Sequence, residues 1–304
     1  MTAGPQVTLG VPVYNGEHYL ATALDSLLAQ DHDSMEILVS DNASTDATPD
    51  IVRAAAERDS RVRVIRQQEN RGGVWNVNFL IAEGRGELFK WAYYDDVCQP
   101  HFVSSCVAAL DSVGPGAVMA YTRAVTIGPE GEVLEERNDA DLRLDAATPH
   151  ERVHNLLHSL ANQTEFGLMR TAAVRRTRGI LPYIGSEMFF LTEMALQGGF
   201  VLVPETLLQL RRHPEQYGRD RFTEAQWYAQ SGQPQSLLPF AKMNTMLAAT
   251  ALRGQLPLAE RARCLAAVGR GWTLPRWRSV ASDLKHLPQT WRARRQVTGA
   301  RPGS

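Results

Sequence analysis

The feature that most constrains this fold is the alternation of strand and helix patterns over the first hundred residues. Four β-branched, apolar or aromatic runs are typical of buried strands, namely Val7–Val13, Glu36–Ser40, Arg61–Ile65 and Leu88–Tyr94. Apolar residues recur at helical spacing between them, in Tyr19–Leu28, around Ile51–Ala55 and in Val74–Glu83. Strands that alternate with helices pair through crossover connections. The sequence therefore predicts an α/β fold, with a mostly parallel sheet flanked by helices.

The pattern changes after Pro100. Helices are predicted over His101–Leu110, His150–Leu160 and Phe189–Leu196, and strands over Ala117–Ile127, Glu132–Glu135 and Phe200–Leu210, with a polar surface loop over Asn138–Thr148. Residues 214–235 lack periodicity and are rich in Gln, Arg, Gly and Tyr, which predicts a mobile loop. Residues 236–304 form a predicted helical C-terminal extension, with helices over Leu238–Leu252 and Leu258–Val268.

Composition narrows the class of protein. A net charge of −1 over 304 residues leaves no basic excess for a general nucleic-acid binder. No apolar run reaches the length of a membrane span, and the first residues lack a signal-peptide pattern. Cys98, Cys106 and Cys264 are odd in number and lack metal-type spacing, so we expect reduced cysteines in a cytoplasmic protein.

The last thirty-five residues are strongly basic and carry several tryptophans. They contain Arg270, Arg276, Arg278, Lys285, Arg292, Arg294, Arg295 and Arg301 against a single acid, Asp283, with Trp272, Trp277 and Trp291 between them. A solvated terminal helix explains this composition. A surface for an acidic partner or for peripheral contact with the inner membrane face explains it as well.

Polar clusters follow the four N-terminal strands, at Pro12–Asn15, Asp41–Asp46, Asn70–Gly73 and Asp95–Asp96. Each alone is ordinary turn chemistry. Because parallel strands share one direction, the four clusters are expected along one sheet edge, where ligands bind in open α/β sheets. Paired carboxylates at that edge suit Mg²⁺ or Mn²⁺, which in turn suit diphosphates.

These clusters resemble the motifs of family 2 glycosyltransferases, which have an A-type nucleotide-sugar-binding fold. Val11–Asn15 is similar to the opening strand motif, Asp41–Asp46 to the D-[DN]-x-S-x-D signature, and Asn70–Gly73 to an N-x-G loop. Tyr94-Asp95-Asp96 resembles the acidic metal motif, with Tyr93 at its first acidic position. Gly185–Glu187, Gly198–Val201 and Leu210–His213 resemble later landmarks, so the likeness covers about residues 7–214.

The resemblance implies a catalytic domain over residues 1–213. Residues 1–100 would be its nucleotide-binding half and residues 101–213 its acceptor half. The implied activity is metal-dependent, inverting, hexosyltransferase-like transfer from a UDP- or dTDP-sugar to an acceptor hydroxyl.

The resemblance also implies roles on the nucleotide side. Asp41 would accept a hydrogen bond from the base, flanked by Pro12 and Tyr14, while Glu17, Asn70 and Arg71 would contact the nucleotide or its phosphates. From the residues alone, Asp41 and Asp46 also suit helix caps, Glu17 suits a first-turn carboxylate, and Arg71 suits a solvated loop.

At the reacting end, the resemblance implies Asp95 toward the ribose and Asp96 toward Mn²⁺ or Mg²⁺. His213 would be a further ligand or a phosphate contact, although a surface histidine is an equal alternative. Glu187 would be the general base, with Glu193 a lesser competitor and a helix-start carboxylate the plain alternative. Gln163–Arg170 and the C-terminal helices are expected to shape the acceptor pocket.

Two other functions remain open at this stage. A catalytically degenerate nucleotide-sugar-binding protein is consistent with Tyr93 in place of an acid. A sugar nucleotidyltransferase also uses paired carboxylates and a metal, but Val11–Asn15 lacks a Gly-rich loop with Lys or Arg. The sequence leaves the sugar, the acceptor (glycan, lipid or natural product) and the oligomeric state undetermined.

Overall fold

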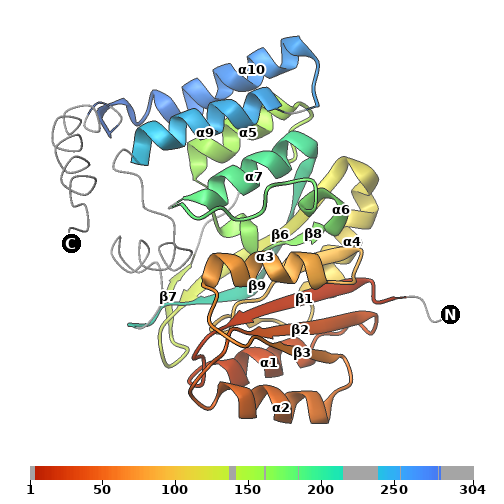
Figure 1. The fold of residues 1–304 in the computed structure, drawn as a ribbon. Coiled ribbons are helices and arrows are strands. Elements are labelled where there is room, and N and C mark those ends of the chain that lie inside the picture. Colours follow the sequence, from red (N-terminus) through yellow and green to blue (C-terminus); the bar gives the residue numbers. More distant parts are fainter. Residues whose placement is uncertain are drawn as a thin grey trace, which may run out of the picture.

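The computed structural model describes residues 4–136, 142–160, 162–183, 185–214, 239–253, 255–279 and 281. Within these residues, a nine-stranded sheet runs in the order β3-β2-β1-β4-β8-β6-β9-β5, with β7 beside β6 (Figure 1). The strands are β1 Val7–Val13, β2 Met35–Asp41, β3 Val62–Arg66, β4 Leu88–Trp91, β5 Val97–Cys98, β6 Ala117–Ile127, β7 Val133–Glu136, β8 Leu168–Arg170 and β9 Gly199–Arg211.

Helices cover both faces of this sheet. The α-helices are α1 Leu20–Leu28, α2 Thr48–Arg58, α3 Gly73–Glu83, α4 Phe102–Val113, α5 Pro149–Ser159, α6 Thr171–Val174, α7 Ser186–Gln197, α9 Pro239–Arg253 and α10 Leu258–Val268. Shorter turns are the 3₁₀ helices η1 Gly114–Gly116 and η2 Asn162–Phe166, and the π-helical turn η3 Gly269–Thr273.

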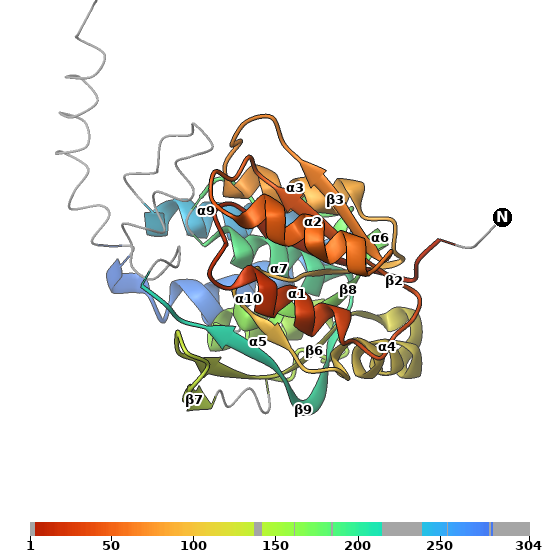
Figure 2. The same ribbon diagram turned by 90° about the horizontal axis from the view of Figure 1, so that it is seen from below.

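The two faces have separate hydrophobic cores. On one face, α1, α2 and α4 contribute buried residues such as Leu24, Val52 and Phe102 (Figure 2). On the other, α3, α6 and α7 pack against the sheet, α5 packs on α7, and α9 and α10 lie against α7 and α5 (Figure 1). This arrangement confirms the predicted α/β class and its flanking helices.

The sheet is mixed in direction. Strands β1 to β4 pair in parallel, as the alternating pattern predicts, and so do β6 and β9. The pairs β4–β8, β6–β8, β6–β7 and β5–β9 are antiparallel. The short strands β5 and β8 were not predicted, because runs of two or three residues are too short to show periodicity.

The predicted C-terminal extension is helical where the structure describes it. Helices α9 and α10 match the expected ranges to within one residue. Most of the predicted mobile loop over residues 214–235 and the basic residues 282–304 lie outside the described residues. No helix in the described part of the chain combines the length and the hydropathy needed to cross a bilayer.

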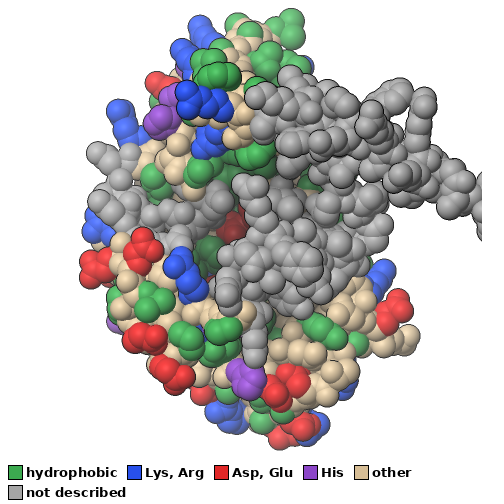
Figure 3. All heavy atoms as spheres, turned by 90° about the vertical axis from the view of Figure 1, so that its left-hand side faces the viewer, with side chains coloured by type: hydrophobic (Ala, Val, Ile, Leu, Met, Phe, Trp, Pro, Cys, Tyr) green, Lys and Arg blue, Asp and Glu red, His purple; other side chains and the backbone are tan. Residues whose placement is uncertain are grey.

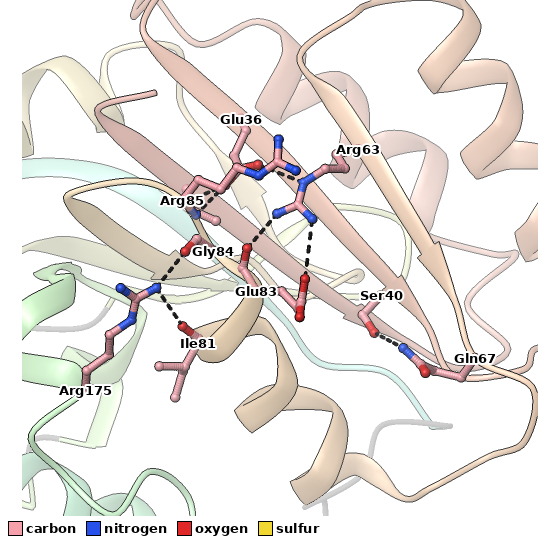
Figure 4. Close-up of polar contacts among 10 residues, drawn as sticks. Glu36, Ser40, Arg63, Gln67, Ile81, Glu83, Gly84, Arg85 and Arg175 are labelled. Atoms are coloured by element: carbon pink, nitrogen blue, oxygen red, sulfur yellow. Dashed lines mark hydrogen bonds and ion pairs between the residues drawn. The ribbon is translucent and has the colours of Figure 1, made fainter. Parts of the chain in front are cut away.

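A polar network centred on the buried Glu36 stabilises the far edge of the sheet, away from the polar clusters (Figure 4). Glu36 accepts hydrogen bonds from the Thr8 hydroxyl at 2.7 Å, the Arg85 backbone N–H at 2.7 Å and Arg63 Nε at 3.0 Å. Arg63 also donates to the carbonyl of Glu83, the last residue of α3, at 2.7 Å. Burial raises the pKa of Glu36, but these hydrogen bonds outweigh it and leave the pKa below its usual value.

Candidate active site

The loops that follow β1 and β2 are joined by a set of hydrogen bonds. Three consecutive backbone N–H groups donate to side-chain oxygens of the second loop: Asn15 to Ser44 at 2.9 Å, Gly16 to Thr48 at 2.8 Å, and Glu17 to Asp46 at 3.1 Å. A Cβ on Gly16 would lie 2.7 Å from the Tyr94 ring, so this position needs glycine to let the turn after β4 pack here. The first, second and fourth polar clusters are therefore in contact.

Pro12 lies near the end of β1 without losing a ladder hydrogen bond. Gly10 accepts from Ala92 on the β4 side, and Val13 accepts from Asn42 on the β2 side. Residues of a parallel strand alternate between their two neighbours, so Pro12 faces the β4 side, where the paired strand has already ended. The pairing of β1 with β4 ends at Gly10, so the backbone at Pro12, which is predicted to flank the nucleotide, has no partner strand on the β4 side.

Glu17 and Tyr14 are placed differently. The Glu17 carboxylate accepts a hydrogen bond from the Ala47 backbone N–H at 3.0 Å, at the start of α2. The carboxylate therefore lies at the start of α2, and the alternative of a first-turn carboxylate of the helix that follows Glu17 is wrong, because α1 begins only at Leu20. Tyr14 is half-buried in the same loop.

Asp41 ends β2 and is only 1% exposed. Its Oδ1 accepts from the Ser44 backbone N–H at 2.9 Å, while Oδ2 makes no hydrogen bond within the described part of the chain and lies 3.4 Å from Arg66 Nε. Helix α2 begins seven residues later, at Thr48, so Asp41 is not its cap. Asp46 does support that helix, since it accepts from the Thr48 backbone N–H at 3.0 Å.

The Asn70–Gly73 loop joins the same edge through Asn42. The Asn70 side-chain oxygen accepts from the Asn42 amide at 2.8 Å and from Gly72 N–H at 2.9 Å. Arg71 is exposed, and its guanidinium lies 4.0 Å from the centroid of the Trp75 ring. Asn70 thus shapes the loop, and Arg71 is held at the surface beside it.

Asp95 and Asp96 lie in a turn, because β4 ends at Trp91, three residues before the predicted end of the strand. Asp95 is buried, and its Oδ2 lies 3.2 Å from Nε2 of His213. Asp96 Oδ1 accepts from the backbone N–H of Arg211 at 3.0 Å. The predicted pair is therefore joined to the end of β9.

Arg211 clamps this turn from β9. Its side chain donates to the Asp95 carbonyl at 2.9 Å and to the Gly128 and Pro129 carbonyls at 3.0 and 2.9 Å. The Tyr19 ring lies 4.6 Å from the His213 ring and 4.8 Å from the Arg211 guanidinium. His213 is therefore buried, and the surface-histidine alternative is wrong.

Four carboxyl groups act on Tyr93 through their charge. Burial raises the pKa of Tyr93 well above its usual value, and so do the charges of Glu165, Glu187, Asp96 and Asp95, in that order. Burial and then the charge of Asp95 raise the pKa of Asp96 in the same way. The strand end thus gathers negative charge that a bound cation would stabilise. Figure 3 faces this edge of the sheet and shows an acidic side chain in a recess near its centre.

Glu187 lies in the first turn of α7, as predicted. Burial and then the charge of Glu187 raise the pKa of Glu165 well above its usual value. The competitor Glu193 is occupied elsewhere, because its two carboxylate oxygens accept from the Arg178 side chain at 2.6 Å and from the Arg178 backbone at 2.8 Å. Glu165 was not singled out from the sequence, which shows only the polar segment around it.

A buried lysine underlies the same turn. Lys90 on β4 is 1% exposed, and its ammonium donates to the carbonyls of Trp91, at 3.1 Å, and of Phe166. It also lies 4.7 Å from the centroid of the Phe102 ring. Lys90 therefore ties η2, and with it Glu165, to the strand that leads to Asp95. No sequence pattern revealed this role, because Lys90 stands inside an otherwise apolar run.

The donor chemistry at this edge fits a divalent cation. No three His, Cys, Asp or Glu side chains cluster as metal ligands within the described ranges. Nevertheless, the aspartate carboxylates and the His213 imidazole at this edge supply oxygen and nitrogen donors of the kinds that bind divalent ions. Mg²⁺-type ions typically use one or two carboxylates and complete their shell with phosphate and water. Two aspartates and one imidazole suffice for that mode of binding.

Comparison with known proteins agrees with these motifs. The family model described as "Glycosyl transferase family 2" matches residues 8–175. Succinoglycan biosynthesis protein ExoO of Rhizobium meliloti is 32% identical over 174 residues, which is 57% of this chain. The chain spans 48% of the length of ExoO, and 28% and 36% of two other curated bacterial relatives.

Solved structures share the fold. S. aureus TarS 1-349 in complex with UDP-GlcNAc has a TM-score of 0.66 at 17% identity, over 92% of this chain and 79% of that chain. The mannosyltransferase PcManGT of Pyrobaculum calidifontis, in complex with GDP-Man and Mn²⁺, has a TM-score of 0.54 at 20% identity, over 96% of this chain and 83% of that one.

Proposed function

Because the chain belongs to glycosyl transferase family 2, we propose that it is a metal-dependent, inverting glycosyltransferase that uses a UDP- or dTDP-sugar. The observation that carries this proposal is the gathering of Asp95, Asp96, Glu165 and Glu187 around Tyr93 at the strand ends. Complexes of TarS with UDP-GlcNAc and of PcManGT with GDP-Man and Mn²⁺ support a nucleotide sugar and a divalent ion for this chain as well.

The nucleotide would bind along the edges of β1, β2 and the Asn70–Gly73 loop. Asp41 would accept the ring N–H of uracil or thymine at Oδ2, the oxygen that makes no hydrogen bond. Pro12 and Tyr14 would flank the base, Asn70 and Arg71 would border the nucleotide, and Asp95 would face the ribose. Glu17 would reach the ribose only by giving up its contact with Ala47.

Asp96 and His213 would hold the ion, with Asp95 beside them. When bound, Mn²⁺ or Mg²⁺ supplies charge neutralisation for the departing diphosphate. The protein's own contribution is to fix both ligands. Arg211 holds Asp96 through its backbone N–H, and Tyr19 packs on the His213 ring.

Transfer requires a base for the acceptor hydroxyl. Glu187 would take that proton while the acceptor oxygen forms a bond to the anomeric carbon of the sugar. The bond from this carbon to the diphosphate breaks on the opposite side, which inverts the configuration. Burial and the charge of Glu187 raise the pKa of Glu165, so Glu165 lies close enough to Glu187 to act on it electrostatically.

The structure disfavours a nucleotidyltransferase. Such enzymes bind phosphates with free backbone N–H groups of the loop after the first strand. Here the N–H groups of Asn15, Gly16 and Glu17 are all bonded to side chains of the next loop. A catalytically degenerate sugar-nucleotide binder remains the second candidate, since Tyr93 replaces the first acid of the metal motif.

A thermal-shift screen of UDP-, dTDP- and GDP-sugars, with and without Mn²⁺, tests donor binding. A donor at 100 times its Kd stabilises the native state by about 2.7 kcal/mol. Release of the nucleoside diphosphate from that donor then separates an enzyme from a degenerate binder. If no nucleotide sugar raises the Tm in either condition, the proposed function is wrong. The acceptor and the cytoplasmic location remain predictions.

A further inference from the structure

The outward face of α10 is apolar and carries no acid. Leu258, Ala262 and Leu265 recur at helical spacing and are exposed, Leu258 to 81%. Ala259, Arg263 and Ala266 are exposed beside them. The one carboxylate of this helix, Glu260, is turned inward and lies 2.7 Å from Nδ1 of His150. A solvent-exposed helix face normally carries charged residues and turns its leucines inward, whereas here Glu260 is turned inward and Leu258 and Leu265 are exposed.

The segment that follows α10 also exposes apolar and basic side chains. Leu274 and Trp277 are exposed, Trp277 to 58%, while Trp272 of the intervening turn is buried. The exposed residues between and after them include Arg270 and Arg278. At the top of Figure 3, over α9 and α10, hydrophobic and basic side chains lie next to one another.

The charge of this segment is one-sided. Residues 258–279 contain five arginines (Arg261, Arg263, Arg270, Arg276 and Arg278) and a single acid, Glu260, which pairs with His150 at 2.7 Å and with Arg263 at 3.4 Å. The whole chain has a net charge of −1, so the positive charge is concentrated here. Exposed leucine and tryptophan bordered by arginine complement an anionic bilayer interface, where apolar side chains enter the acyl boundary and the cations meet the headgroups.

We infer that the exposed apolar side chains of α10 and of the segment after it (Leu258, Ala262, Leu265, Leu274 and Trp277), with the exposed Arg263, Arg270 and Arg278 among them, form a docking face for an anionic lipid bilayer. The contact is interfacial, since α10 has only 11 residues and none of the described helices suits a membrane span. A second copy of the chain fits less well, because a two-fold contact would bring the arginines of both copies together. The basic, tryptophan-bearing region that the sequence singled out, residues 270–304, overlaps these residues only in its first part, and residues 282–304 lie outside the described part of the chain.

Co-sedimentation of the full chain with phosphatidylcholine vesicles, with and without 30% phosphatidylglycerol, tests the docking face. We expect sedimentation with the anionic vesicles only, weakened at high salt because the exposed arginines are screened. The double variant Leu258→Ser/Trp277→Ser should reduce the bound fraction at least tenfold, and Arg263→Gln/Arg278→Gln should abolish the preference for anionic lipid. Both variants change exposed side chains, and an unchanged Tm will confirm that they fold.

The matched control is Val133→Ser/Leu134→Ser on β7. These residues are also exposed, to 61% and 51%, but their neighbours Glu132, Glu135 and Glu136 are acidic. This control should bind vesicles as the wild type does. Absence of wild-type binding to anionic vesicles, or equal loss in the control, would overturn the inference. So would a wild-type dimer that Leu258→Ser/Trp277→Ser converts to a monomer, because the face would then join two copies.

Discussion

The imidazole of His213 lies against the carboxylate of Asp95, with Nε2 of the ring 3.2 Å from Oδ2. The two residues are 118 positions apart, and they meet because β9 ends beside the turn that follows β4. Both side chains are buried, and Nδ1 of the ring has no hydrogen-bond partner among the described residues. A buried, incompletely bonded imidazole beside the Asp95 carboxylate is better explained by a ligand than by stability alone.

Asp96→Asn should remove the Mn²⁺-dependent part of donor binding. The amide keeps an oxygen that can accept from Arg211 N–H, so the fold should persist, but it loses the charge that attracts the ion. At a donor concentration of 100 Kd, about 2.7 kcal/mol of ligand stabilisation should disappear. Thermal shift with UDP-sugar and Mn²⁺ measures this loss. Asp111→Asn, on the exposed side of α4, is the control, and full Mn²⁺-dependent stabilisation of Asp96→Asn would contradict the metal assignment.

Asp41→Ala should weaken nucleotide binding by about 1–3 kcal/mol, because a charged hydrogen-bond acceptor for the base is removed. Calorimetric titration with the free nucleoside diphosphate measures the change. Asp46→Ala is the matched control, since Asp46 supports the start of α2 through Thr48. It should lower the free energy of unfolding by about 0.5–2 kcal/mol and, because it also frees the Glu17 N–H, weaken nucleotide binding less than Asp41→Ala does. Equal affinities of Asp41→Ala and wild type would assign Asp41 a structural role.

The nucleotide side of the site was predictable because its residues follow strands within the same sequence pattern. Each of Asp41, Asn70 and Asp95 stands directly after an apolar run or a turn signal, and parallel pairing brings these ends together. The burial of His213 was not predictable, because it depends on the contact of β9 with a turn more than a hundred residues earlier.

The acceptor side shows the limit of sequence patterns more clearly. Glu165 stands in a polar segment without periodicity, and only its position beside Tyr93 and Glu187 reveals it. Lys90 was hidden for the opposite reason, because it occupies an inward position of a strand where an apolar residue is expected. The positions of Glu165 and Lys90 both depend on β8, a strand of three residues that lies between β4 and β6 in the sheet.

The stability of the protein should depend on Glu36 at acidic pH. The folded-state pKa of Glu36 lies below 4.5, since hydrogen bonds from Arg85, Thr8 and Arg63 outweigh burial. A lowered carboxylate pKa stabilises the fold above the unfolded-state value, and this contribution is lost as the pH falls through the folded-state pKa. Chemical unfolding of wild type and Glu36→Gln should differ by about 1–3 kcal/mol at pH 7. The difference should shrink below pH 4.5, whereas Glu57→Gln, at an exposed position of α2, should match the wild type throughout.

Lys90→Met should detach η2 from β4. The variant leaves the Phe166 carbonyl without its buried donor, which costs about 1–3 kcal/mol of unfolding free energy. Because η2 carries Glu165, we also expect a higher KM for the acceptor with little change in donor affinity. Lys242→Met provides the comparison, since that ammonium also lies over an aromatic ring, Tyr183, but is only half-buried. A Lys90→Met protein with wild-type stability and acceptor KM would show that the lysine does not hold this segment.

Glu187→Gln should lower the rate of sugar transfer by about 10²–10⁴-fold, the usual contribution of a general base. Donor affinity should barely change, because the nucleotide is proposed to contact Asp41, Asp95 and Asp96 instead. Glu193→Gln is the informative comparison, since it lies on the same helix, α7, two turns further on. Both carboxylate oxygens of Glu193 accept hydrogen bonds from Arg178. The Glu193→Gln substitution should therefore lower stability and leave turnover per folded molecule near that of wild type. Transfer and donor binding should be assayed separately for both variants. Wild-type turnover in Glu187→Gln, together with lost transfer in Glu193→Gln, would assign the base to Glu193 and reverse the assignment.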